Sequence, residues 1–105
     1  MIYELRHYVP VAGKEEALRH RFANGTLQLF EKLDIKVIDF WEHADMPGEL
    51  WYLVEWPDQA AMKAGWEAFR KDPDWQALKT RTEVDGALTA AITSIPLKPA
   101  EFFAR

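Results

Sequence analysis

The sequence predicts a single α+β domain of the ferredoxin-like type, in which helices cover one side of an antiparallel sheet. Segments that alternate in polarity and segments with helical periodicity follow one another in the order β-α-β-β-α-α-β. The chain has 105 residues, which is a common size for one domain. No linker or internal repeat divides it, so we expect one unit over residues 1–105.

The first strand and the first helix follow directly from the pattern. Residues 2–8 (IYELRHY) alternate in polarity and are rich in strand-forming residues. Pro10 and Gly13 then mark a turn. Residues 14–33 form a predicted helix whose apolar positions recur at helical spacing. These positions are Leu18, Phe22, Leu29 and Leu33.

Gly25 falls on the same apolar stripe and allows two interpretations. Glycine costs about 1 kcal/mol relative to alanine in a helix, so the helix could break at Asn24 and Gly25. Alternatively, the missing side chain lets the helix lie close on the sheet. We favour the second interpretation, because the apolar period continues across the glycine.

A hairpin and two helices are predicted in the second half. Residues 35–43 and 49–56 form strands joined by a loop that contains ADMPG. Asp58 is a predicted N-cap for the next helix. In "WEAFRKDPDW" a second cap, Asp72, followed by proline ends that helix near residue 71 and starts another. The corner lets Trp66 and Trp75 pack inward, and residues 88–95 form the last strand.

Each strand combines a nearly pure apolar face with a mixed face that carries aromatic residues. In an antiparallel sheet with helices on one side, the apolar face is the one that the helices cover. The residues assigned to the apolar face are Tyr3, Leu5, Ile38, Phe40, Leu50, Tyr52, Val54 and Trp56. The residues assigned to the mixed face are Glu4, Arg6, Tyr8, Val37, Asp39, Trp41, His43, Trp51, Leu53 and Glu55.

The mixed face predicts a homodimer. It would expose Trp41, Trp51 and Leu53, a patch that monomeric proteins rarely leave open. A second copy of the chain, packed sheet to sheet about a two-fold axis, would cover it. The alternative is that a long loop or the C-terminal segment KPAEFFAR covers the patch. Whether dimers assemble further is left open.

The same mixed face is the predicted ligand site, because aromatic walls with a few polar groups are typical of small-molecule pockets. His43 is the candidate general base. Arg6 either forms a structural pair with Glu4 or binds an anionic group such as a carboxylate while Glu4 holds it. His7 is expected to pack at the strand end, and His20 to be solvated between Arg19 and Arg21. The predicted ligand-binding residues are Glu4, Arg6, Tyr8, Asp39, Trp41, Trp51 and Glu55.

Composition narrows the function classes. The net charge of −4 argues against a nucleic-acid partner. The absence of cysteine excludes disulfides and thiolate chemistry. No histidine and carboxylate spacing suggests a metal site, and no cofactor is expected. No apolar run reaches the length of a membrane span or a signal peptide, so we expect a cytoplasmic protein.

Several segments together resemble the NIPSNAP family: "YELRHY", "FWEH", "LWYLVEW", "WEAFRKDPDW" and "SIPLKPAEF". The resemblance covers nearly the whole chain, and "WEAFRKDPDW" is its most specific part. It implies a dimeric α+β barrel, but no family-wide reaction. Similar folds include cofactor-independent monooxygenases, lactone isomerases and haem-degrading oxygenases. The later helices lack the histidine that would bind haem iron in the last group.

Two functional hypotheses follow. In the first, the barrel binds a small apolar or aromatic molecule, held by Arg6 if it is anionic, as a cofactor-independent oxygenase or isomerase. In the second, the chain is a homodimeric binding or interaction module without catalysis.

Overall fold

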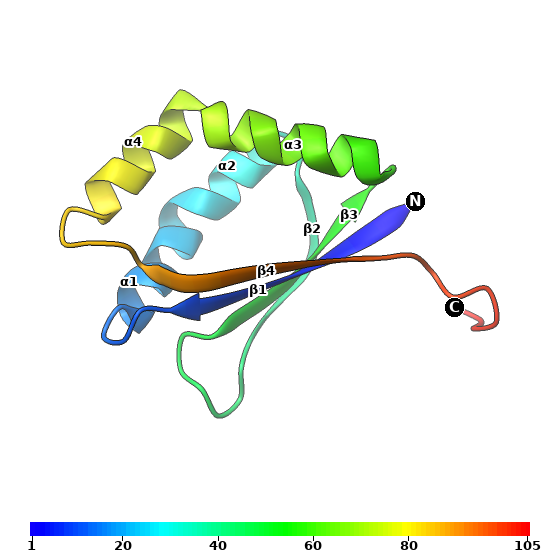
Figure 1. The fold of residues 1–105 in the computed structure, drawn as a ribbon, viewed down its shortest axis with the longest axis horizontal. Helices are drawn as coiled ribbons and strands as arrows, with labels where there is room; N and C mark the ends of the chain where they lie inside the picture. The colour runs from blue at the N-terminus through cyan, green and yellow to red at the C-terminus, as the bar shows by residue number, and fades with distance from the viewer.

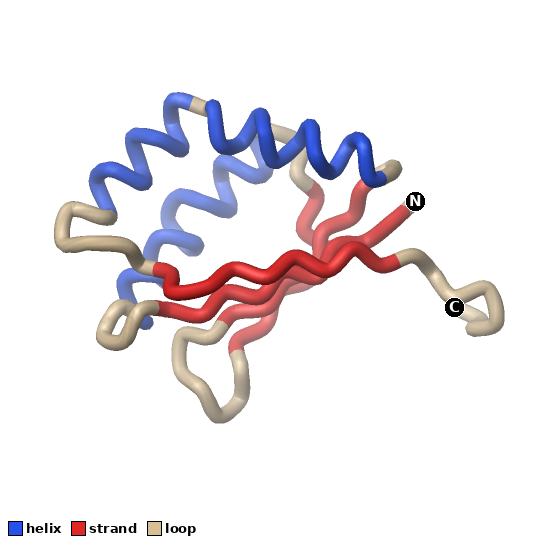
Figure 2. The backbone as a smooth tube through the Cα atoms, in the orientation of Figure 1, coloured by secondary structure: helices blue, strands red, loops and turns tan.

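One layer of helices packs on one side of a four-stranded sheet in the computed structural model, which describes residues 1–105 (Figure 1). Figure 2 shows that the opposite side of the sheet carries no helix. The predicted order of elements is confirmed. The elements are β1 (Ile2–Pro10), α1 (Glu15–Arg21), the π-helical turn η1 (Phe22–Thr26), α2 (Leu27–Lys32), β2 (Lys36–Glu42), β3 (Leu50–Trp56), α3 (Gln59–Lys71), α4 (Pro73–Thr82) and β4 (Thr89–Leu97).

The strands are antiparallel in the order β2-β3-β1-β4. In β3 the alternation of buried and half-buried residues follows the predicted faces without a break. Tyr52 and Val54 are completely buried, and Leu50 and Trp56 nearly so, which confirms the helix-covered face of this strand. The aromatic rings of Phe22 and Phe30 pack on Tyr52 from the helix layer and complete the centre of the core.

The predicted faces of β1 are wrong. Glu4 pairs with Val54, and Tyr8 pairs with Leu50, so the polar-looking set lies under the helices. Glu4 is 1% exposed and Tyr8 7% exposed. The alternation of the two faces was identified correctly, but the face predicted to be open is the one that the helices cover. The polar groups of β1 can be buried there because they find hydrogen-bond partners on distant segments.

Tyr3, Leu5 and His7 consequently lie on the open face of the sheet. There the ring of His7 stacks on Trp51, with 3.7 Å between ring centroids. Its Nε2 atom lies 2.6 Å from Oε1 of Glu49. His7 is therefore packed, as predicted, but against the open face.

A β-bulge in β2 explains a second error. The register with β3 shifts between Val37 and Asp39, which inverts the period-two pattern at that point. Val37 packs against the core, whereas Ile38 is 44% exposed. Phe40 stacks on Tyr52 at 5.0 Å, so its predicted inward position is confirmed.

The helical segment predicted over residues 14–33 consists of α1 and α2 joined by the π-turn η1, and it is kinked there. The N–H of Leu27 donates to the carbonyl oxygen of Phe22, and Asn24 departs from helical dihedral angles. The favoured interpretation of an unbroken helix is therefore wrong in part, because the chain kinks at Asn24, where the alternative interpretation placed a break. Gly25 lies against α4 rather than the sheet, because a Cβ atom there would sit 2.6 Å from a methyl group of Leu78. Arg21, which the sequence places beside His20 on the polar side of the helix, is only 5% exposed.

Asp72 forms the corner between α3 and α4. Its Oδ1 accepts hydrogen bonds from the N–H groups of Asp74 and Trp75, and its Oδ2 accepts one from Nζ of Lys32 at 3.0 Å. Pro73 occupies the first helical turn. The turn of the chain lets Trp75 pack on Phe69, with 4.6 Å between ring centroids, as the sequence predicted.

We predict that Asp72→Asn lowers the thermal unfolding midpoint at neutral pH, although asparagine caps helices as well as aspartate does. The hydrogen bond from Lys32 is the main cause that lowers the pKa of Asp72. Desolvation acts in the opposite direction, and the hydrogen bonds from the two backbone N–H groups add to the lowering. A lowered pKa in the folded state stabilises the protein above the unfolded-state value of about 4, and this contribution is lost as the pH falls through the folded pKa. The difference between wild type and variant should therefore shrink in acid.

Calorimetric melts from neutral to acidic pH test this, with Asp74→Asn as the control. Asp74 contacts the same Lys32 at 2.8 Å, but its side chain is 68% exposed, so its removal should matter less. A difference for Asp72→Asn that is independent of pH would contradict the proposed origin of the effect.

Candidate functional site

A cavity of about 280 Å3 lies between the sheet and the helices, on the β4 side of the molecule. Its wall combines side chains from β1, α1, η1, α3, α4 and β4. The lining residues are Arg6, Tyr8, Arg21, Phe22, Thr26, Trp66, Phe69, Arg70, Trp75, Lys79, Glu83, Thr89 and Ile92.

Aromatic side chains form most of the apolar wall. Trp66 and Phe69 meet edge to face at 5.7 Å, and Trp75 continues the surface beyond Phe69. On the sheet side, Tyr8 contacts the ring of Phe22 at 5.2 Å. The helix corner at Asp72 therefore has a role in the cavity, because it directs Trp75 into the wall.

The carboxylate of Glu4 lies behind this wall and is bound by four donors. Its Oε1 accepts hydrogen bonds from the indole N–H groups of Trp56 at 2.9 Å and Trp66 at 2.7 Å. Its Oε2 accepts from the Ser94 hydroxyl and from Nη1 of Arg6. Glu4 thus connects β1 with β3, α3 and β4, and has no free lone pair directed at the cavity.

Arg6 joins Glu4 to two tyrosines. Its Nη2 donates to the Tyr8 hydroxyl at 2.9 Å and its Nε to that of Tyr52 at 3.1 Å, while the guanidinium lies 4.1 Å from the Trp66 ring. Burial alone would lower the pKa of Arg6, but the charge interactions and hydrogen bonds with Tyr52 and Tyr8 outweigh it and raise that pKa. Burial also raises the pKa of Tyr52, which stays protonated at neutral pH.

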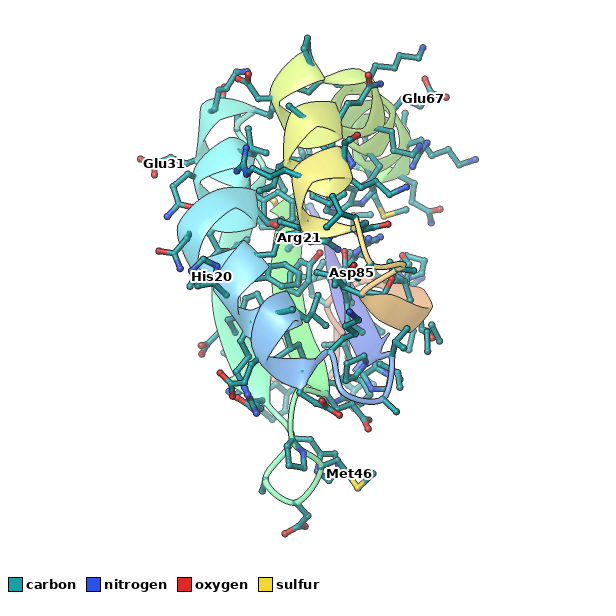
Figure 3. All side chains as sticks on the ribbon, turned by 90° about the vertical axis from the view of Figure 1, so that its left-hand side faces the viewer. His20, Arg21, Glu31, Met46, Glu67 and Asp85 are labelled. Carbon is teal, nitrogen blue, oxygen red and sulfur yellow. The ribbon has the colours of Figure 1, made fainter.

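Two polar groups of the helix wall lack hydrogen-bond partners. Nη1 of Arg21 donates to Glu83 at 2.7 Å and to Thr82 at 3.2 Å, but its buried Nε makes no hydrogen bond. The hydroxyl of Thr26, which is 3% exposed, has no partner either. Figure 3 shows Arg21 on the inner side of its helix toward α4, whereas His20 lies on the outer side.

The predicted site residues divide between two faces. Arg6 and Tyr8 line the cavity, and Glu4 supports it from behind. Trp41 and Trp51 pair with each other on the open face of the sheet. Asp39 and Glu55 lie on that face too, where Glu55 is 2.8 Å from Nζ of Lys36.

His43 lies in the loop after β2, away from the cavity. Its Nδ1 accepts hydrogen bonds from the N–H groups of Asp45 and Met46 at 3.0 and 3.1 Å. These contacts hold the turn that leads into β3. The imidazole therefore has a structural contact that explains its presence without catalysis.

Sequence reasoning missed four cavity residues on the helices: Arg21, Thr26, Arg70 and Lys79. From the sequence, Arg21 was identified only as a neighbour of His20 on the polar side of the helix. The available signal was the Asn24-Gly25 pair, which interrupts a regular helix and so changes which residues share a face.

No helix is both long and apolar enough to cross a membrane. No three His, Cys, Asp or Glu side chains are grouped so as to hold a metal ion.

Fold and cavity together define an α+β protein with a ferredoxin-like sheet. A family model described as NIPSNAP matches residues 3–103. The chain belongs to the NIPSNAP family. No curated protein matches the sequence.

Solved structures show the same fold. An uncharacterized NIPSNAP domain protein from Burkholderia xenovorans is 23% identical with a TM-score of 0.80, and the match covers 100% of both chains. A NIPSNAP family protein from Agrobacterium tumefaciens is 18% identical with a TM-score of 0.81, over 96% of this chain and 94% of that one. An antibiotic biosynthesis monooxygenase is 12% identical with a TM-score of 0.68, over 95% of this chain and 99% of that one.

We predict that Glu4→Gln destabilises the protein by about 3 kcal/mol, since it removes one partner of a buried ion pair and leaves Arg6 without its counter-charge. The matched control is Glu55→Gln, on a neighbouring strand but on the open face, which should cost less than about 1 kcal/mol because Lys36 is largely exposed. Urea unfolding of both variants measures the difference. Equal losses would show that the Glu4 network does not hold the layers together.

Proposed function

We propose that this protein binds a small apolar or aromatic molecule in the cavity between its sheet and its helices. The observation that carries the proposal is the cavity wall, in which aromatic rings alternate with a few polar groups. Such a composition is typical of small-molecule sites. The volume of about 280 Å3 suits a ligand of one or two fused rings.

The proposed ligand site is this cavity and not the open face of the sheet. Arg6 and Tyr8 were among the predicted ligand-binding residues and also line the cavity, because their side chains lie on the helix-covered side of β1. Four donors already surround Glu4, and each of three Arg6 nitrogens has a partner, which supports the structural interpretation of this pair.

An oxygenase or isomerase reaction is the catalytic form of this proposal. Such a reaction needs a group at the cavity wall that gives or accepts a proton. The Tyr8 hydroxyl is placed for this role, since it lines the cavity and bonds to both Arg6 and Tyr52. The fold shared with an antibiotic biosynthesis monooxygenase is compatible with it.

The protein also forms a homodimer in this proposal, through the open face of the sheet. Trp41, Ile95 and Leu97 are 47%, 41% and 44% exposed there. A second copy offers an equally apolar sheet face and would cover these residues.

The second candidate function is a homodimeric interaction module without catalysis. The same exposed apolar face favours it. The two candidates differ in whether the cavity is occupied in the working protein.

Calorimetric titration with naphthylmethanol, a neutral two-ring probe, tests the cavity. We expect Ile92→Trp to weaken binding at least tenfold, because Ile92 lines the cavity and the larger ring would fill it. Ile92 is 49% exposed, so the fold should tolerate the change. Ile38→Trp is the control, since Ile38 is 44% exposed on the far edge strand. Equal binding of naphthylmethanol to the wild type and to Ile92→Trp would refute the proposal, and so would undetectable binding to the wild type of both this probe and its carboxylate analogue naphthoate.

Light scattering after size-exclusion chromatography tests the dimer. The 12.2 kDa chain should elute at twice its mass, and Trp41→Asp should convert it to a monomer by placing a charge in the interface. Val84→Asp is the matched control, because Val84 is 77% exposed in the loop after α4. A monomeric wild type, or a dimeric Trp41→Asp variant, would rule out this interface.

A further inference from the structure

We propose that Arg21 and Thr26 form an anion-binding subsite in the cavity and that the ligand is a carboxylate attached to an apolar or aromatic body. The inference rests on the proposed function, because it names the class of ligand for the same cavity. Its evidence is separate: a distorted helical turn, two polar groups without partners and an excess of positive charge.

The π-turn brings the two residues to one face. In a regular α-helix, residues three and four apart share a face, and residues five apart do not. In η1 the hydrogen bond from the N–H of Leu27 to the carbonyl oxygen of Phe22 joins residues five apart, so the turn is wider than in an α-helix and residues five apart come closer to one face. Arg21 and Thr26 are five apart and both line the cavity. π-turns of this kind are frequent at functional sites.

Both residues keep unused hydrogen-bonding capacity in a buried position. Arg21 is 5% exposed and Thr26 is 3% exposed, yet the Nε of the arginine and the hydroxyl of the threonine have no partner. Buried polar groups without partners are uncommon, and each needs an explanation. A carboxylate can accept a hydrogen bond from each of them at once.

The surrounding structure fixes the guanidinium in place. Two hydrogen bonds from Nη1 of Arg21 reach Thr82 and Glu83, and the guanidinium carbon lies 5.1 Å from the centre of the Trp75 ring. The arginine is thus anchored through Nη1, while its buried Nε has no hydrogen-bond partner. The aromatic wall next to it would contact the body of the ligand.

The side chains that line the cavity carry an excess of positive charge, although the chain as a whole is acidic. This local charge favours the binding of an anion. The lining contains four cationic side chains, Arg6, Arg21, Arg70 and Lys79, and one carboxylate, Glu83. Glu4 neutralises Arg6 from behind the wall, and Glu83 pairs with Arg21. Arg70 and Lys79 are exposed and would attract an anion to the opening.

The test compares naphthoate with naphthylmethanol, which share a ring system and a substitution position and differ in charge. Calorimetric titration of the wild type should give at least tenfold tighter binding for naphthoate. In Arg21→Met this ratio should fall to about one, while the alcohol still binds. Arg81→Met is the control, because Arg81 is an exposed residue of α4 outside the cavity lining, and it should keep the ratio.

Thr26→Val provides a second variant that does not depend on an ion pair. The hydroxyl of Thr26 has no hydrogen-bond partner within the protein. Its replacement by the methyl group of valine should therefore leave thermal stability unchanged or raise it. The same change should weaken naphthoate binding about threefold to tenfold and leave naphthylmethanol binding unchanged. If Thr26 were purely structural, Thr26→Val would lower thermal stability and leave naphthoate binding unchanged.

The outcomes separate this inference from the proposed function. Equal affinity of the wild type for both probes, or a ratio unchanged in both Arg21→Met and Thr26→Val, overturns the anion subsite and leaves the cavity proposal standing. No binding of either probe overturns both.

Discussion

The buried carboxylate of Glu4 is the interaction on which the rest of the structure depends. One side chain accepts hydrogen bonds from β1, β3, α3 and β4, so it holds the helix layer against the sheet. A buried charge is tolerable only when its partners are complete, which fixes the positions of Trp56, Trp66 and Arg6 together. Through Arg6 the same network orients Tyr8 at the cavity wall.

The polar network explains why the two faces of the sheet differ in kind. On the covered face, β1 contributes charge and hydroxyl groups whose partners lie on β3, on β4 and, through Trp66, on α3. The helices supply most of the aromatic wall of the cavity. On the open face, the apolar side chains of Leu5, Trp41 and Trp51 share the surface with Asp39 and Glu55. The proposed ligand site and the proposed dimer interface therefore lie on opposite sides of one sheet, and a substitution on either side can test one proposal without the other.

The sequence was sufficient for the order of the elements and for the starts of α3 and α4, because these depend on local chemistry. The caps at Asp58 and Asp72 act through neighbouring backbone N–H groups. The face of β1 was not predictable from polarity, since the partners that permit a buried Glu4 lie about 50 residues or more along the chain. The bulge near Ile38 likewise depends on pairing with β3.

Only part of the candidate site could be predicted from the sequence, because local pattern identifies some of its residues and long-range structure brings in the others. Arg6 and Tyr8 were identified as polar and aromatic residues on one strand face, which is a local property. Arg21 and Thr26 come together only because the helix widens at η1, and the contact of Gly25 with Leu78 of α4 accompanies that distortion. Periodicity based on a regular helix separates them.

The most direct measurement is a crystal structure of the protein grown with naphthoate. The account predicts one ligand in each chain, with its rings between Trp66 and Trp75 and its carboxylate at Arg21 and Thr26. Ligand density on the open face of the sheet, or between two facing sheets with an empty cavity, would contradict the central claim.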